Sequence, residues 1–216
     1  MGDRRTIIDH THPAYIRARN RIGKSRWNGA YYYSKEICEF IIPKIETDRN
    51  WVTINIHEEQ VGCDHAIVII HNHFHPERYE WLKKYDDLIL VCSAEQDMEQ
   101  LGHLGKTIFL PLSIDVEYTK QFIRPKTRDI AYAGRLEKKG KLPPGTDIIS
   151  GLSRKPFLAK LATYRKVYCV DRVELEAKVL GCEVLHNNIP SFAPEEVIDI
   201  RDAAVMLQKA LEEIDE

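Results

Sequence analysis

Short apolar runs alternate with longer amphipathic stretches along this chain, and that alternation limits the folds that it can adopt. The runs are rich in β-branched residues, and several are too continuously apolar to leave one face in water, which is typical of strands in a parallel sheet covered by helices. An α/β fold follows. Strands are predicted at residues 6–9, 52–56, 66–70, 88–92, 107–112, 129–134, 147–150, 167–170 and 183–186.

The segments between these runs have the patterning of helices. Ser93 is predicted to cap the N-terminus of one of them, and Gly181 to end another in the left-handed conformation of a C-cap. A final acidic helix either packs on the second half of the chain or crosses back over the first. The predicted helices cover residues 34–45, 76–85, 93–104, 153–164, 173–181 and 194–216.

A polar passage at residues 113–128 interrupts the alternation, which then restarts. We therefore expect two Rossmann-like parallel-sheet domains, residues 1–115 and 116–216, that face a cleft. In open parallel sheets, ligands bind outside the carboxyl ends of the strands, so the chemistry is expected there.

The bulk composition is that of a folded protein, with 44% hydrophobic and 30% charged residues among 216. No apolar run approaches the roughly 20 residues that span a bilayer, and the polar start has no signal-peptide core. We expect a cytoplasmic protein without a membrane span. The five cysteines form no C-x-x-C pair, so reduced structural thiols are predicted.

One strand end carries a glycine followed by cations. In "DIAYAGRLEKKG" the strand finishes at Gly134, where the backbone can approach a phosphate, and Arg135 and Lys139 can neutralise it. Ser153 opens the next helix, whose free N–H groups can also take an anion. The alternative is that Gly134 makes a turn and the cations are solvated.

Three stretches resemble GT-B glycosyltransferases of the group 1 C-terminal domain type. The stretch from "VCSAEQ" through "LPLSID" resembles the segment that joins the two halves of that family, although Ser113 stands where the family commonly has Gly. "DIAYAGRLEKKG" and "LEAKVLGCEVL" are similar to two donor-site motifs. The three landmarks occur in the family's order over roughly residues 85–190.

The resemblance implies a site for a sugar nucleotide. Arg135 and Lys139 fall where the family holds the diphosphate, and Glu176 falls on the carboxylate that accepts hydrogen bonds from the ribose hydroxyls. Tyr168 stands where retaining families carry a second Glu, and Asp171 is the nearest acid. The second domain is also short, which implies an altered donor pocket.

Asp9, His10 and His12 directly follow the first predicted strand. Inverting GT-B enzymes carry a catalytic base there, often a His held by an acid, and a His titrates near working pH. We therefore predict this group as catalytic; the alternative is a pair of loop histidines without a role. Because Tyr168 replaces the expected Glu, inversion is the expected stereochemistry.

A second histidine group, "HNHFH", has the alternating spacing of zinc ligands at His71, His73 and His75. No carboxylate follows at a metal-site interval, so we favour residues lining an acceptor cleft and expect no metal.

The predicted function is a metal-independent glycosyltransferase with a nucleotide-diphosphate sugar as donor and no other cofactor. The acceptor is open, and a basic N-terminal loop is compatible with nucleic acid. One alternative is a catalytically degenerate GT-B-like protein that binds a nucleotide or a partner. A less favoured alternative is a metal-dependent hydrolase built on the histidines. The basic residues of the loop are Arg17, Arg19, Arg21, Lys24 and Arg26.

Overall fold

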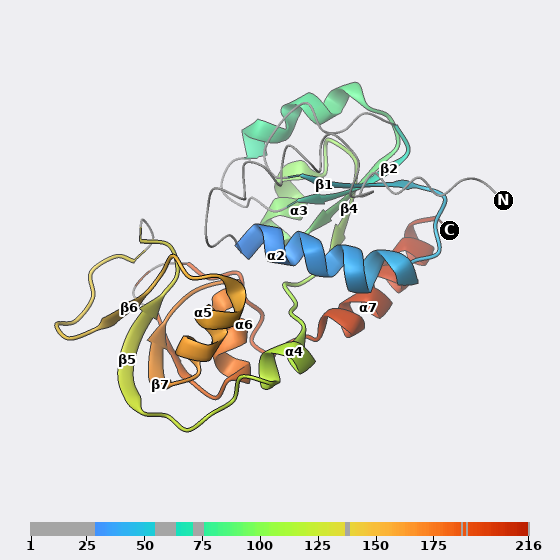
Figure 1. Ribbon diagram of the computed structural model, residues 1–216. Coiled ribbons are helices and arrows are strands. Elements are labelled where there is room, and N and C mark those ends of the chain that lie inside the picture. The colour runs from blue at the N-terminus through green and yellow to red at the C-terminus, as the bar shows by residue number, and fades with distance from the viewer. Residues whose placement is uncertain are drawn as a thin grey trace. The chain divides into compact units, whose positions relative to one another are not determined.

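The computed structural model of the chain is an α/β protein with two separate four-stranded sheets (Figure 1). The structure describes residues 29–54, 64–70, 76–136, 139–186, 188 and 190–215. Contacts divide the chain into two compact units. Of the described residues, those within 30–111 and 201–215 belong to the first unit, and Gly29 and those within 112–200 belong to the second.

The first sheet is all parallel, in the order β1-β2-β3-β4. Its central strands β2 (Ala66–Ile70) and β3 (Leu88–Cys92) are buried along their whole length, which explains their uninterrupted apolar sequences. Both coincide with the predicted ranges. The outer strands are β1 (Asn50–Ile54) and β4 (Lys106–Phe109). The strand predicted at residues 6–9 lies outside the described residues.

The core of the first unit packs against β2 and β3. Tyr79 and Leu82 of the 3₁₀ helix η3 (Pro76–Lys84) are almost fully buried there, together with Leu101 of α3 (Glu95–Leu101). The prediction that Ser93 caps α3 is wrong. Ala94 occupies the N-cap position and no side chain caps the helix, because β3 is followed by an extended residue before the helix begins.

The first predicted helix changes its winding along its length. It consists of α2 (Gly29–Glu36), a π-helical turn η1 (Ile37–Ile41) and a 3₁₀ turn η2 (Ile42–Lys44). Pro43 lies at the start of the last turn, and its missing N–H accounts for the loss of α-helical hydrogen bonding at this end.

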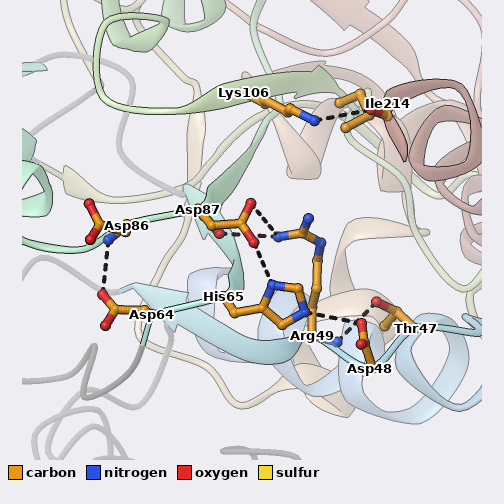
Figure 2. Close-up of polar contacts among 9 residues, drawn as sticks. All are labelled: Thr47, Asp48, Arg49, Asp64, His65, Asp86, Asp87, Lys106 and Ile214. Carbon is orange, nitrogen blue, oxygen red and sulfur yellow. Dashed lines mark hydrogen bonds and ion pairs between the residues drawn. The ribbon is translucent and has the colours of Figure 1, made fainter. Parts of the chain in front are cut away.

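The last helix, α7 (Ile200–Asp215), groups with the first unit. Lys106 at the start of β4 donates to the Ile214 carbonyl at 3.1 Å (Figure 2), and Gln208 accepts the Glu46 N–H at 2.8 Å. The helix begins six residues later than predicted, because Asp199 pairs with Ile114 in a parallel bridge and the Ile200 N–H bonds the Ile114 carbonyl. Backbone pairing thus keeps the chain extended up to the helix.

The second sheet is also all parallel, in the order β6-β5-β7-β8. From β5 (Arg128–Ala133) the chain passes to β6 (Asp147–Ile149) on one side, then to β7 (Tyr164–Tyr168) on the other, and on to β8 (Glu183–Leu185). Both sheets therefore agree with the predicted parallel α/β class and with two Rossmann-like domains.

The helices of the second unit are α4 (Val116–Lys120), α5 (Arg154–Leu161) and α6 (Arg172–Val179). Both crossovers, from β6 to β7 and from β7 to β8, run in the same direction across the sheet, which places α5 and α6 on one face when each is right-handed. Gly181 follows α6 at φ 72°, which confirms its predicted role in ending the helix. Among the described residues, no helix combines the length and apolarity needed to cross a bilayer.

Candidate functional site

The order of the second sheet reverses at β5, and this defines where a ligand is expected. Strands β6 and β7 lie on opposite sides of β5, so the connections that leave β5 and β6 diverge at the carboxyl edge. Such a switch point leaves a crevice outside the strand ends in open α/β sheets. Gly134 follows β5 at this edge, and Tyr168 ends β7.

Gly134 makes a turn that other residues would not readily form. Its φ is 152°, and a Cβ at this position would lie 3.0 Å from the Tyr132 hydroxyl. That hydroxyl donates a hydrogen bond to the Arg135 carbonyl at 2.5 Å, while the Gly134 N–H bonds the Ile149 carbonyl of β6. The glycine therefore allows the backbone to turn at the strand end while the Tyr132 hydroxyl and the Gly134 N–H both keep their hydrogen bonds.

A cavity of about 600 Å³ opens at this edge. Its wall combines a cation, an aromatic ring and polar groups with two apolar residues. The residues that line it are Lys141, Leu142, Pro143, Tyr168, His186 and Asn188.

None of the residues of this wall was among the predicted site residues, and Tyr168 was singled out only as the residue that replaces an expected Glu. His186 directly follows β8, and Lys141 follows Lys139 by two residues in the same loop, so strand ends and the local run of cations were signals for both. Leu142 and Asn188 carried no recognisable signal, because they come from loops that only the tertiary fold brings together.

The predicted phosphate-binding residues lie along the same edge and are exposed. Arg135 and Lys139 belong to the loop between β5 and β6, but the cavity wall includes Lys141 rather than either of them. Ser153 occupies the N-cap position of α5 as expected, with an extended backbone, although its hydroxyl makes no capping hydrogen bond. The structure thus places these three residues at the edge without assembling them into one pocket.

Glu176, the predicted ribose ligand, is fully buried at 0% exposure. Its Oε1 contacts the guanidinium of Arg154, the first residue of α5, and lies 2.9 Å from Nε of Arg172, the first residue of α6. Both arginine side chains are 7% exposed. The carboxylate therefore joins the N-terminal turns of two helices.

The junction between β7 and α6 is held in an unusual backbone conformation. Asp171 has φ 56° and ψ −132°, a region that residues with a side chain rarely adopt. Its N–H donates to Ser191 Oγ at 2.8 Å and its carboxylate accepts the Phe192 N–H at 3.1 Å. Ser191 in turn donates to the buried Glu174 at 2.7 Å. These bonds fix the direction in which α6 leaves the sheet.

The described cysteines are free thiols and serve packing. Cys92 and Cys169 are buried in strand regions, and burial raises the pKa of the Cys92 thiol to about 12. Desolvation also raises the pKa of Cys169, and the nearby Glu174 adds to the shift. Because the thiolate is the reactive form, these side chains are unreactive at neutral pH.

A second polar cluster lies at the amino edge of the first sheet (Figure 2). His65, which precedes β2, places Nδ1 2.5 Å from Asp87 Oδ2 and Nε2 3.1 Å from Asp48 Oδ1. Arg49 contacts the other Asp87 oxygen at 3.0 Å. Both imidazole nitrogens are engaged, so His65 has no nitrogen left to act as a base, and the cluster serves to join the turns before β1, β2 and β3.

The predicted catalytic group, Asp9, His10 and His12, lies outside the described residues, as do His71, His73 and His75. Their roles stay predictions. Within the part of the chain that the structure describes, no three His, Cys, Asp or Glu side chains come together as a metal site.

No known protein family, curated protein or solved structure matches this chain. What the fold and the site define is a two-unit parallel α/β protein with a polar cavity at the switch point of its second sheet. Its function is therefore argued from that edge.

Proposed function

We propose that the chain is a glycosyltransferase that takes its sugar from a nucleotide-diphosphate sugar bound by the second unit. The observation that carries this proposal is the cavity of about 600 Å³ at the carboxyl edge, where β5 ends in Gly134 and the strand order reverses. Small-molecule sites commonly have volumes of roughly 300–1,000 Å³ and occur at such switch points.

The chemistry of the wall fits a nucleotide. The ring of Tyr168 offers a face on which a base can stack, and the Asn188 amide can both donate and accept hydrogen bonds. Lys141 supplies a positive charge to the cavity wall. The resemblance of residues 129–140 and 175–185 to the donor-site motifs of GT-B enzymes supports the same ligand class.

The loop after Gly134 supports diphosphate as the leaving group. The seven residues 135–141, which follow the end of this strand, contain four cations: Arg135, Lys138, Lys139 and Lys141. Negative charge develops on the diphosphate as the glycosidic bond breaks, and cations placed there stabilise the transition state more than the ground state. These side chains can stabilise the charge of the leaving diphosphate, a role for which other transferases use a divalent metal.

The acceptor would be activated by the first unit. A general base must take the proton of the acceptor hydroxyl as the oxygen attacks the anomeric carbon, and His10 or His12 beside Asp9 remains our candidate.

Calorimetric titration of nucleoside diphosphates and nucleotide sugars tests the donor site. We expect Arg135→Ala and Lys141→Ala to weaken binding of a nucleoside diphosphate at least tenfold more than binding of the nucleoside. Lys209→Ala, an exposed cation on α7, is the matched control and should have no effect. If no nucleotide binds the wild type at millimolar concentration, the donor-site proposal fails.

A nucleotide-binding protein without transferase activity is the second candidate. It is favoured by Tyr168 at the position of an expected catalytic Glu and by the burial of Glu176. The two candidates differ in turnover: a transferase releases free nucleoside diphosphate when a sugar nucleotide meets its acceptor, whereas a binding protein releases none above the uncatalysed rate.

A further inference from the structure

Glu176 lies one helical turn inside α6. The resemblance to GT-B enzymes implies that its carboxylate accepts hydrogen bonds from the ribose hydroxyls of the nucleotide. We propose instead that Glu176 is a positioning residue, which locks the N-terminal turns of α5 and α6 through Arg154 and Arg172 and makes no contact with the nucleotide. The inference rests on the proposed nucleotide site, because Glu176 would hold the wall of that site in place.

Burial is the first argument. The Glu176 side chain is 0% exposed, and the two guanidinium groups that contact it are nearly as buried. Both contacts fall on the same oxygen, Oε1, while Oε2 is buried without a hydrogen-bond partner in the described structure. A ribose hydroxyl could therefore reach neither oxygen without displacing the side chains that bury this carboxylate.

Electrostatics give the second argument. A hydrogen bond between two charged groups is roughly twice as strong as one between neutral groups. Exchanging the contacts to Arg154 and Arg172 for neutral ribose hydroxyls would replace strong bonds by weak ones. It would also leave buried guanidinium groups without this carboxylate, and removing one partner of a buried ion pair is strongly unfavourable. Glu176 is therefore poorly suited to a transient ligand and well suited to a permanent anchor.

The position of the anchored helices connects Glu176 to the cavity. Arg154 begins α5 after β6, and Arg172 begins α6 after β7, and these two strands are the neighbours of β5 on either side. The ion pairs therefore tie together the helices that start beside the end of β5. Tyr168, which lines the cavity, precedes Arg172 by four residues.

The β7–α6 junction transmits this constraint. Asp171 stands between Tyr168 and Arg172 at φ 56°, and Ser191 holds its N–H. A backbone in this region persists only where its surroundings enforce it. Loosening α6 at Arg172 is expected to release Asp171 and to move Tyr168 out of the cavity wall.

Titration of the wild type with each nucleoside diphosphate and its 2′,3′-dideoxy analogue separates positioning from contact. If Glu176 does not touch the ribose, removing its charge does not change how much the ribose hydroxyls contribute to binding. The ratio of the two affinities should therefore agree within about threefold between the wild type and Glu176→Gln. A dideoxy penalty above tenfold that disappears in Glu176→Gln would overturn the proposal.

Glu176→Gln keeps the shape of the side chain and removes its charge. We expect it to weaken nucleoside diphosphate binding at least tenfold at a temperature where the variant is fully folded, with partial recovery in Glu176→Asp. Glu183→Gln, which changes an exposed carboxylate of the same unit, is the control and should bind as the wild type does. A folded Glu176→Gln that binds as tightly as the wild type contradicts the proposal.

Amide hydrogen exchange gives a readout that needs no ligand. Glu176→Gln should lower the protection factors of the Asp171 and Glu174 amides, which bond Ser191 and the Asp171 carbonyl. Glu183→Gln should leave them unchanged. If the wild type binds no nucleotide, the proposed function fails, and exchange at these two amides still decides whether Glu176 positions the junction. If Glu176→Gln does not fold, Arg172→Lys, which keeps the charge and loses the guanidinium geometry, takes its place.

Discussion

His65 and Asp87 form a short contact, 2.5 Å from Nδ1 to Oδ2, although the backbone of each residue is left-handed, at φ 55° and 50°. The opposite ring nitrogen of His65 meets Asp48 at 3.1 Å. A carboxylate only accepts hydrogen bonds, so two carboxylates are satisfied only when both ring nitrogens carry a proton. The geometry therefore favours the imidazolium.

The hydrogen bonds to Asp87 and Asp48 raise the pKa of His65, and the bond to His65 lowers the pKa of each carboxyl, with Arg49 adding to the effect on Asp87. The stabilisation from His65 is complete below its unfolded pKa of about 6.5 and is lost as pH rises through its folded value. The stabilisation from the carboxyls is present above about pH 4 and is lost as pH falls through their folded values.

The first prediction is that the free energy of unfolding has its maximum in the mildly acidic range because of this cluster. His65→Asn, which tolerates a left-handed backbone, should flatten the alkaline side of the profile. Urea titrations from pH 4 to pH 9 measure the effect. The control is His103→Asn, which removes a histidine whose Nε2 lies 2.8 Å from Glu80. Equal slopes for wild type and His65→Asn would contradict the prediction.

The second prediction concerns the turn at Gly134. Gly134→Ala should lower the free energy of unfolding by about 1–3 kcal/mol, since alanine rarely adopts this φ and its Cβ would meet the Tyr132 hydroxyl at 3.0 Å. Gly145→Ala is the control because its φ is also positive, at 81°, and the space around its Cβ is open. The loss should be larger at Gly134, and only there should nucleotide binding weaken. The same loss at both positions would show that the contact with Tyr132 has no consequence.

The third prediction is that Lys126 joins the ends of two helices. Its ammonium donates to the Ala162 carbonyl at 3.0 Å and the Leu180 carbonyl at 2.6 Å, the C-caps of α5 and α6, and lies 3.2 Å from Cys182 Sγ. Lys126→Met keeps most of the stem and should cost about 1.5–3 kcal/mol, the range for hydrogen bonds to a charged group.

Chemical denaturation measures the loss at Lys126. Lys120→Met, at an exposed position on α4, serves as the control and should change stability by less than about 0.5 kcal/mol. A Lys126→Met protein as stable as this control would show that solvent or neighbouring groups satisfy the two carbonyls equally well.

The fourth prediction concerns the stereochemistry of the proposed transfer. With a base after the first predicted strand and Tyr168 in place of a second Glu, direct attack on the anomeric carbon should invert its configuration. Proton NMR of the first product formed reads the anomeric centre. The His10→Ala/His12→Ala double variant should lose about a hundredfold or more in turnover with donor binding little changed. Retention, or full activity of the double variant, would exclude this mechanism.

Sequence patterning located the strands best where burial is complete. Strands β2 and β3 are buried residue by residue, so their apolar runs have the same bounds as the strands themselves. The start of α7 was misplaced because it depends on the pairing of Ile114 with Asp199, which are 85 positions apart in sequence. Local propensity carries no information about such a contact.

The candidate site was predictable in its place and less so in its members. Gly134 at a strand end indicated the carboxyl edge of the second sheet, where the cavity lies, since the rule for parallel sheets needs only the order of elements. Whether a side chain there is free for a ligand depends on its neighbours in space. Glu176 matched a motif by position, and its two arginine partners come from two different helix starts that the motif does not describe.

The bridge between Ile114 and Asp199 has a consequence for how the chain is assembled. Ile114 lies near the start of the segment Leu112–Ile200 and Asp199 near its end, so the bridge brings the two ends of this segment together. Leu112–Ile200, which makes up most of the second unit, is thus an insertion in the sequence of the first unit, and it can complete its contacts during synthesis before α7 has been made. Because its ends are adjacent, we expect Leu112–Ile200 to fold when it is produced without the rest of the chain.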